Sequence, residues 1–306
     1  MSTDTQKVRV IVFPGVQNLP SFAAEEQGFF AKRGLAVETV YTQSSKQQRD
    51  GLADGLYDIA HSAIDNAIAM VDAAGKDVVI VIGLDRGFNK LVVQPHIRSY
   101  EDLRGKKLAV DAPDTAFALI AYEMLKQRGL NRGDYHVKVV GATRFRLEAL
   151  KEGAVDFSLL NLPFNLFAQR DGLVVLDNPA QVIGDYQSAG AFVQRSRGMQ
   201  NRDVLVAYLA AYIEGLRWCL ILQNRKFATA LLQKRMDLPP AVAKKCITQV
   251  TDPNFGFTTD AKINHEGMNT VLQLRANFSE NSRSAIPLAS KYLDESYYQD
   301  ALARLY

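Results

Sequence analysis

A repeated strand–helix–strand pattern is the feature that most constrains the fold of this 306-residue chain. The strand VRVIVF (8–13) leads into the helical stretch PSFAAEEQGFFAKR (20–33), where apolar residues recur at helical spacing, and the strand AVETVY (36–41) follows. Gly34 stands where helices commonly end in a left-handed residue. A helix between two strands packs back on a parallel pair, so this pattern predicts an α/β fold.

The pattern recurs twice more before residue 90, each time with the residues of a capping box at the start of the helix. The strand after the last of these helices, DVVIVIGLD (77–85), is nearly all apolar. Such a composition is typical of a strand covered by helices on both faces of a mostly parallel sheet. The expected capping boxes pair Ser45 with Gln48 and Ser62 with Asp65.

A second series of strands and helices begins near residue 90, and the last third of the chain is helical. We therefore predict two doubly wound lobes joined by a hinge of two crossings, near 86–90 and 186–196, with the helical C-terminus on lobe 1. The expected domains are 1–88 plus 195–306 for lobe 1 and 89–194 for lobe 2. The strands of the second series are KLVVQP (90–95), KLAVD (107–111), HVKVVG (136–141), VDFSLL (155–160) and LVVLD (173–177).

Composition excludes several classes of protein. The 36 basic and 33 acidic residues are interleaved and give a net charge of only +3, so no nucleic-acid partner is expected. Cys219 and Cys246 are predicted to be two buried thiols rather than a disulfide. The apolar stretch 204–222 carries Glu214 and Arg217, which predicts a buried amphipathic helix without membrane insertion. The sequence has no nucleophile elbow and no signature of a nucleotide, dinucleotide or metal site, so no cofactor is expected.

The loops that follow the strands are the expected ligand site. In open α/β sheets, ligands bind outside the carboxyl ends of the strands. Helix N-termini there present backbone N–H groups that suit a carboxylate or a sulfonate. The expected ligand-binding residues lie on these loops and strand ends: Phe13, Asn18, Ser45, His61, Ser62, Asp65, Asp114, Thr115, Arg144, Asn161, Phe164 and Tyr186.

Each of these assignments has a plainer alternative. Arg144 begins a helix directly after a strand, where its guanidinium either binds an acidic group or is simply solvated. His61 ends a strand and has an ordinary pKa near neutrality, so it either serves the ligand, as a partner or an acid–base group, or holds a neighbouring loop. Asp111 joins His61 as a catalytic group only if the protein is an enzyme. Helix capping is the alternative for Asp114 or Thr115.

Four segments also resemble a known family. They are PSFAAEEQGFFAKRGLAVE, GLADGLYDIAHSA, VVIVIGLD and SYEDLRGKKLAVDAPDTAFALIAYEMLKQRGL. In order and spacing, residues 8–195 are similar to the nitrate-, sulfonate- and taurine-type solute-binding proteins of ABC importers, whose fold is shared with the thiamine-pyrimidine synthase-like proteins. The resemblance implies the periplasmic-binding-protein type II fold, closure of two lobes on a small ligand, and delivery to a membrane permease. It also implies that Thr115 contacts ligand oxygens.

Two functions follow from these expectations. The leading interpretation is binding of a small organic anion, a carboxylate or sulfonate, in a cleft between the lobes, without chemistry. The alternative is a cytosolic, cofactor-free lyase, a decarboxylase or dehydratase of an aromatic or cyclic acid, on the same scaffold. The cysteine-rich stretch of the pyrimidine-synthesising relatives is missing. Since MSTDTQKVRV leads straight into a strand, we expect a cytoplasmic location, or a periplasmic one with an ABC permease as partner if a leader was removed.

Overall fold

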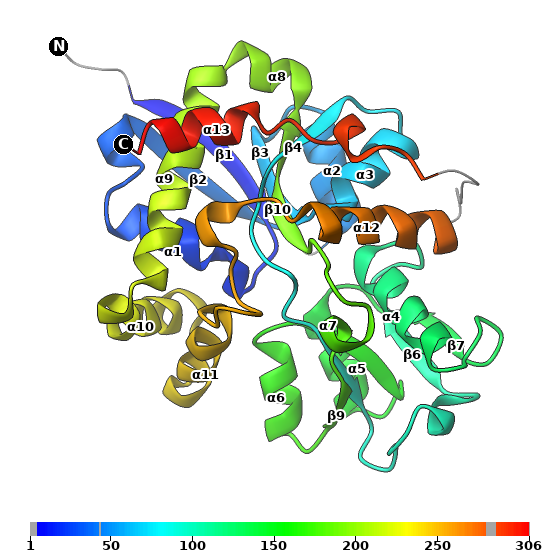
Figure 1. Cartoon of the computed structure of the whole chain (residues 1–306). Helices are drawn as coiled ribbons and strands as arrows, with labels where there is room; N and C mark the ends of the chain where they lie inside the picture. Colours follow the sequence, from blue (N-terminus) through cyan, green and yellow to red (C-terminus); the bar gives the residue numbers. More distant parts are fainter. Residues whose placement is uncertain (1–4, 43, 280–285, 306) are drawn as a thin grey trace. The chain divides into compact units, whose positions relative to one another are not determined.

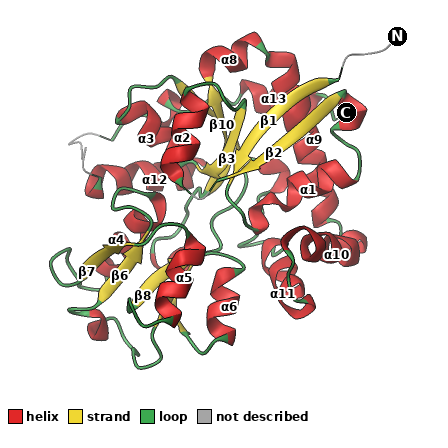
Figure 2. Ribbon diagram, turned by 180° about the vertical axis from the view of Figure 1, so that it is seen from behind, coloured by secondary structure: helices red, strands yellow, loops and turns green. Residues whose placement is uncertain are grey.

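The computed structural model describes residues 5–42, 44–279 and 286–305 (Figure 1). The chain forms two compact units. Unit 1 comprises Met1–Arg86, Gln187–Asn264 and Leu288–Tyr306. Unit 2 comprises Gly87–Tyr186 and His265–Pro287. Each unit has its own five-stranded sheet with helices packed on it (Figure 2), which confirms the predicted α/β class.

The sheet of unit 1 has the strand order β2-β1-β3-β10-β4. β1 is parallel to both of its neighbours, whereas β10 is antiparallel to β3 and to β4. Most of the second crossing predicted near 186–196 is therefore strand β10, which lies inside this sheet. The bounds are β1 (Gln6–Val12), β2 (Leu35–Tyr41), β3 (Ile59–Ala63), β4 (Val78–Gly83) and β10 (Ala189–Gln194).

The long helix α9 (Arg202–Leu220) is the centre of the helical packing in unit 1 and lies against α1 (Leu19–Glu26) and α13 (Ser296–Ala303). At Gly215 the backbones of α9 and α1 come so close that an added Cβ would lie 2.3 Å from the Pro20 carbonyl oxygen. The other helices of this unit are α2 (Ser45–Ala53), α3 (Asp65–Asp72), α8 (Arg195–Gln200), α10 (Arg225–Met236), α11 (Pro240–Val250) and the short η1 (Val16–Asn18), η2 (Ala31–Arg33), η4 (Leu222–Asn224), η5 (Thr259–Ala261) and η6 (Ala289–Lys291).

The sheet of unit 2 has the order β7-β6-β8-β5-β9. β6 is parallel to β7 and β8, and β5 is antiparallel to β8 and β9. The strands are β5 (Lys90–Val93), β6 (Lys107–Val110), β7 (His136–Val139), β8 (Phe157–Leu160) and β9 (Val174–Asp177). The helices are η3 (Glu101–Leu103), α4 (Ala116–Gln127), α5 (Thr143–Lys151), α6 (Phe164–Arg170), α7 (Pro179–Val182) and α12 (His265–Phe278).

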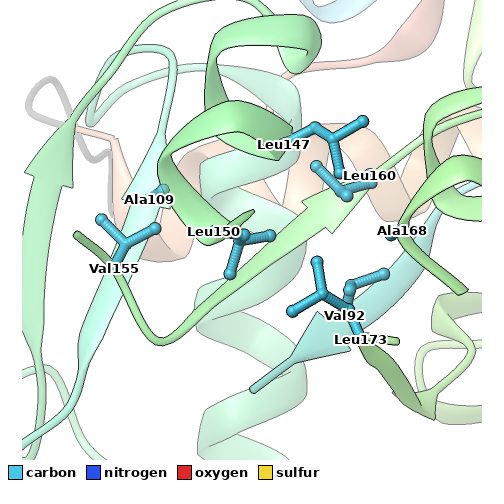
Figure 3. Close-up of a cluster of buried hydrophobic side chains, with 8 residues drawn as sticks. All are labelled: Val92, Ala109, Leu147, Leu150, Val155, Leu160, Ala168 and Leu173. Atoms are coloured by element: carbon cyan, nitrogen blue, oxygen red, sulfur yellow. The ribbon is translucent and has the colours of Figure 1, made fainter. Parts of the chain in front are cut away.

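One face of this second sheet is sealed by a cluster of buried aliphatic side chains (Figure 3). Leu147 and Leu150 point from α5 toward Leu160 on β8, while Val92 extends from β5. Burial of such side chains contributes about 1.5–3 kcal/mol each, so this cluster fixes α5 on the sheet. The rest of the cluster is Ala109, Val155, Ala168 and Leu173.

The structure corrects the predicted helix caps. Ser44, not Ser45, is the N-cap residue of α2, and its hydroxyl accepts the N–H of Gln47 at 3.4 Å. The Ser45–Gln48 box is therefore wrong by one residue. The Ser62–Asp65 box is also wrong, because Ser62 lies within β3 and α3 begins without a side-chain cap.

The boundaries of the units also differ from the predicted domains. The predicted lobe 1 contains every residue after 194, but α12 belongs to unit 2, where it packs on α4. A ring contact between Phe278 and Tyr122, with centroids 6.0 Å apart, is part of that packing. Helical periodicity shows that a segment has an apolar face, but it does not show which sheet the face covers.

Two smaller predictions concern α9 and the cysteines. Among the described residues, no single helix is long and apolar enough to cross a membrane. The pair Arg202–Leu220 and Leu222–Met236 reaches that length and composition only together, and it bends by 82° at the break. Cys219 and Cys246 are free and buried, as expected. Burial raises the pKa of both thiols, that of Cys246 to about 12.

Candidate functional site

In unit 1 the carboxyl ends of four strands lie at one edge of the sheet. β2 and β3 run parallel to β1, and β4 has the same direction because it and β3 are both antiparallel to β10. The segments that follow these strands therefore meet at that edge, together with the start of β10. The predicted residues Phe13, Asn18, His61, Ser62 and Asp65 lie at the ends of these strands or in the segments that follow them.

His61 is the centre of a buried aromatic group at this edge. Its Nε2 lies 3.0 Å from the hydroxyl of Tyr208, and its ring packs on Tyr212 with centroids 4.7 Å apart. Tyr208 stacks on Phe30 in turn. Burial lowers the pKa of His61 to about 3, since the charged imidazolium would lose its hydration. His61 is therefore neutral at physiological pH, and the expectation that it acts as an acid–base group near neutrality is not supported.

A hydrogen-bond network around Gln48 holds His61 and Ser62 in place. The Gln48 amide donates to the carbonyl oxygens of Ile11 and His61, each at 3.2 Å. Its oxygen accepts the Ser62 hydroxyl at 2.6 Å, and Ser62 accepts from Asn66 at 3.2 Å. Ser62 thus joins β3 to α2 and α3. Its role in the fold is structural, as predicted, but it acts through these hydrogen bonds and not as a helix cap.

The remaining predicted residues of unit 1 have simpler surroundings. Asn18 is buried and donates its amide to the carbonyl oxygen of Phe13 at 2.8 Å, which shapes the turn after β1. The Phe13 ring is half-buried. Asp65 is buried in the first turn of α3, where the helix dipole favours a negative charge. Ser45 lies in α2 and is partly exposed.

Unit 2 brings a second group of predicted residues together after β6. The Thr115 hydroxyl, at the N-cap position of α4, donates toward Asp111 and lies 2.9 Å from the Ala112 carbonyl oxygen. The structure assigns neither Thr115 nor Asp114 a side-chain hydrogen bond that caps α4. Asp114 pairs with the buried Arg275 at 3.2 Å. These carboxylates are thus engaged with partners from their own unit.

Two arginines of α5 have different surroundings. Arg144, the predicted anion ligand, is exposed and lies over the ring of Phe145 at 4.4 Å. Arg146 is almost completely buried, with 2% of its surface exposed. It donates to the carbonyl oxygen of Leu159 at 2.9 Å and to the hydroxyl of Thr143 at 2.8 Å. Its Nε has no partner among the described protein groups.

Asparagines line the end of β8. Asn161 follows the strand directly, and Asn165 is buried in the first turn of α6. The Asn165 amide donates to the carbonyl oxygens of Phe88, at 2.9 Å, and Leu160, at 3.3 Å. Phe164 is partly buried against the aliphatic cluster, and Tyr186 is buried at the end of this part of the chain.

Several residues with unusual surroundings were not among the predicted ones. Arg146 shares the apolar face of α5 with Leu147 and Leu150, and that helical spacing could have identified it. Tyr208 and Tyr212 come from α9, far from His61 in the sequence, and no local pattern links them to it. In the described part of the chain, no group of three His, Cys, Asp or Glu side chains is placed to hold a metal ion. The cleft expected between two lobes stays a prediction.

Solved structures share this fold. The nitrate-binding protein NrtA of Synechocystis has a TM-score of 0.81 at 17% identity, with 99% of this chain and 89% of that one covered. The aliphatic sulphonate-binding protein SsuA of Escherichia coli has a TM-score of 0.76 at 20% identity, with 94% and 92% covered. Both are periplasmic binding proteins, so the predicted periplasmic-binding-protein fold is confirmed.

Sequence comparisons agree with the fold. A protein of Brachyspira hyodysenteriae, named as an ABC transporter periplasmic binding protein, is 23% identical over 231 residues, or 70% of this chain. The match spans 65% of that relative's length. The family model described as NMT1/THI5 like matches residues 16–224, well over half of the chain. The chain therefore belongs to the NMT1/THI5-like family.

Proposed function

We propose that this protein is the solute-binding component of an ABC importer and that it binds a small organic anion. The observation that carries the proposal is the buried guanidinium of Arg146 near the carboxyl ends of the strands in unit 2. Its two hydrogen-bond partners, the Leu159 carbonyl and the Thr143 hydroxyl, are both neutral. A carboxylate, sulfonate or nitrate is the partner whose geometry and charge suit a guanidinium with a free N–H.

The electrostatics of Arg146 support this assignment. Burial lowers the pKa of the Arg146 guanidinium, and the carboxylate of Asp111 opposes that effect. The guanidinium of Arg146 lies over the ring of Phe117, 5.3 Å from its centroid, and no carboxylate is among its hydrogen-bond partners. A buried charge without an anion in direct contact destabilises the ligand-free protein, and an anion that reaches the free Nε removes that cost.

In unit 1, the buried group around His61 is aromatic and neutral. His61 and Tyr212 supply neutral aromatic rings, and the Tyr212 hydroxyl has no partner among the described groups. A pKa of about 3 makes His61 a weak base at neutral pH, which favours binding over the acid–base chemistry of a lyase.

The relatives support the wider proposal. The nitrate- and sulphonate-binding proteins with this fold are periplasmic, and the Brachyspira relative is named as a component of an ABC transporter. We therefore propose an extracytoplasmic location and an ABC permease as the partner of this protein, in place of the cytoplasmic location first expected.

Isothermal titration with nitrate, ethanesulfonate and propionate tests the binding site. Two variants on the same helix form a matched pair: Arg146→Met removes the buried charge at similar volume, and Arg144→Ala removes the exposed one. Arg146→Met should weaken the binding of every anion that the wild type takes by roughly 10- to 150-fold, the equivalent of about 1.5–3 kcal/mol for a hydrogen bond to a charged group. Arg144→Ala should leave the affinity unchanged.

The opposite result, with Arg144→Ala weakening binding and Arg146→Met having no effect, would restore the residue predicted from the sequence. If the wild type binds none of the anions, the anion class is wrong. Far-UV circular dichroism checks that both variants fold. Arg146→Lys gives a second measurement, since it keeps the charge but loses the planar fork, and an intermediate affinity is expected.

A further inference from the structure

The net positive charge of the chain is concentrated in residues 221–250, which form the corner after α9 and the helices α10 and α11. This segment has six basic side chains and one acidic one, Asp237. Because the whole chain has 36 basic and 33 acidic residues, the remainder carries more acidic than basic side chains. A charge separated in this way marks a surface that attracts an anionic partner.

Most of this positive charge is not neutralised by the protein. The two arginines of the segment are engaged, since Arg235 pairs with Glu25 at 2.6 Å and Arg225 donates to the hydroxyl of Thr248 at 3.2 Å. The four lysines are exposed, and within the described parts of the chain none of them pairs with a carboxylate. These lysines are Lys226, Lys234, Lys244 and Lys245.

Exposed apolar side chains accompany the lysines. Eleven large hydrophobic side chains are exposed in the described chain, and three of them lie between residues 221 and 227. Ile221, 47% exposed, and Leu222, 72% exposed, occupy the corner where the chain bends by 82° after α9. Phe227, 65% exposed, follows in the first turn of α10. Single exposed apolar residues are ordinary, but a group of them indicates an interaction surface.

The helical period puts Phe227 and the lysines of α10 on one outward face. Lys226, Phe227 and Lys234 are exposed, whereas the other side of the helix is buried and packs on α1 and α11. Figures 1 and 2 both show α10 at the outer edge of unit 1. The bond from Arg225 to Thr248 joins the start of α10 to the exposed side of α11, one turn after the two lysines of that helix.

This combination of side chains favours a membrane surface over a folded protein. Interfaces between proteins are depleted in lysine, and an aromatic anchor there fills a shaped pocket of the partner. A bilayer interface takes apolar side chains without such a pocket, and long lysine stems let the ammonium groups reach lipid phosphates. Roughly four to eight basic residues around an amphipathic helix are typical of contact with anionic phospholipid.

We infer that the corner after α9 and the outward face of α10 form a surface that rests on a bilayer containing anionic phospholipid. Leu222 and Phe227 enter the headgroup region, and the lysines bind lipid phosphates. The contact is peripheral and reversible. It belongs to unit 1, whereas Arg146, the residue proposed to bind the solute, belongs to unit 2.

Co-sedimentation with lipid vesicles tests the charged part of this surface. Vesicles of phosphatidylcholine are compared with vesicles of equal parts phosphatidylcholine and phosphatidylglycerol, at about 0.1 M NaCl, where the Debye length is about 10 Å. The wild type should bind the anionic vesicles at least about tenfold more tightly, because each lysine near such a surface contributes about fivefold. Lys226→Gln plus Lys234→Gln should therefore weaken binding by about 25-fold. Lys76→Gln plus Lys138→Gln removes the same charge at exposed positions on other elements and should leave binding nearly unchanged.

The apolar part of the surface has a separate test. Leu222→Ser plus Phe227→Ser keeps the charge and should weaken binding to the anionic vesicles by about tenfold or more. Phe227→Trp adds a fluorescent probe, which lipids with brominated acyl chains in the same vesicles should quench. Val139→Trp, at a position 59% exposed on β7, should be quenched no more than the wild type, which has only Trp218. Far-UV circular dichroism checks that each variant folds.

Three results would overturn the inference. The first is that the wild type binds both kinds of vesicle equally or binds neither. The second is that the control lysine pair loses as much affinity as the α10 pair. The third is that the serine variant binds like the wild type while soluble polyglutamate binds as tightly as the vesicles, because an acidic protein chain is then the partner. The experiment needs neither solute nor permease, so its failure leaves the proposed function standing, and failure of the anion titration leaves this surface standing.

Discussion

Replacing the buried His61 by glutamine should make the stability of unit 1 less sensitive to acid. In the native protein His61 is buried, and its pKa is lowered to about 3. In the unfolded chain an ordinary histidine has a pKa of about 6.5. Between these two values the unfolded state binds a proton that the native state does not, so lowering the pH favours unfolding. Glutamine at position 61 keeps a polar group for the Tyr208 hydroxyl but cannot titrate.

The size of the effect follows from the two pKa values. The stability that neutral His61 contributes is fully present above the unfolded pKa and is lost as the pH falls below it. Between pH 7.5 and pH 5 the wild type should lose about 2 kcal/mol of unfolding free energy through this one residue. The native pKa lies well below this window, so the result hardly depends on its exact value. Other titrating groups act equally in both proteins and cancel in the difference.

Urea denaturation at the two pH values measures the difference. Trp218 is the only tryptophan of the chain and lies on α9, the helix that also carries Tyr208, so its fluorescence reports on unit 1. The quantity to compare is the change in unfolding free energy between pH 7.5 and pH 5 in the wild type and in His61→Gln. If the two changes are equal within about 0.5 kcal/mol, His61 does not titrate differently on unfolding, and the argument from burial is refuted.

Two further predictions concern the framework of unit 1, and both are measured by urea denaturation followed at Trp218. Gln48→Leu should lower the unfolding free energy by about 2–4 kcal/mol, because the carbonyl oxygens of Ile11 and His61 lose their donor; a loss below 1 kcal/mol would show that this network is dispensable. Gly215→Ala should cost about 1–3 kcal/mol through the close approach of α9 and α1, and an unchanged midpoint would contradict that contact.

The parts of the fold that depend on local sequence pattern were predictable. Strand and helix alternate with clear periodicity, and the nearly all-apolar stretch 77–85 contains β4, in which every residue is buried. Helix caps were harder, because Ser44 and Ser45 are adjacent and both fit the cap preference. The partner of each helix was not predictable either, since an apolar face packs equally well on any sheet that offers a matching surface.

In the candidate site, too, features set by local sequence were predictable and contacts between distant segments were not. Parallel strands bring their carboxyl ends to one edge, so His61 and Ser62 could be placed there before the structure was known. What surrounds them depends on contacts between segments distant in sequence, such as that of His61 with Tyr208. For Arg144 and Arg146 the helical period predicts which side chain is buried, because the buried positions of α5 lie at 143, 146, 147 and 150. An arginine on an apolar face is uncommon, which makes it a useful signal.

The position of β10 has a consequence for how the protein is made. β3 and β4 follow one another in the chain, yet they are not neighbours in the sheet, because β10 lies between them. While the ribosome is still extending the chain toward residue 189, both strands have an edge without its final partner.

Unpaired edges of apolar strands are sites where a chain associates with other chains. β4, with every residue buried in the finished sheet, is the most exposed to that hazard. Newly made chains that stop short of β10 should therefore aggregate or bind chaperones, whereas chains that extend past residue 194 can close the sheet. Synthesis of β10 thus marks the point at which all five strands of the unit 1 sheet are present.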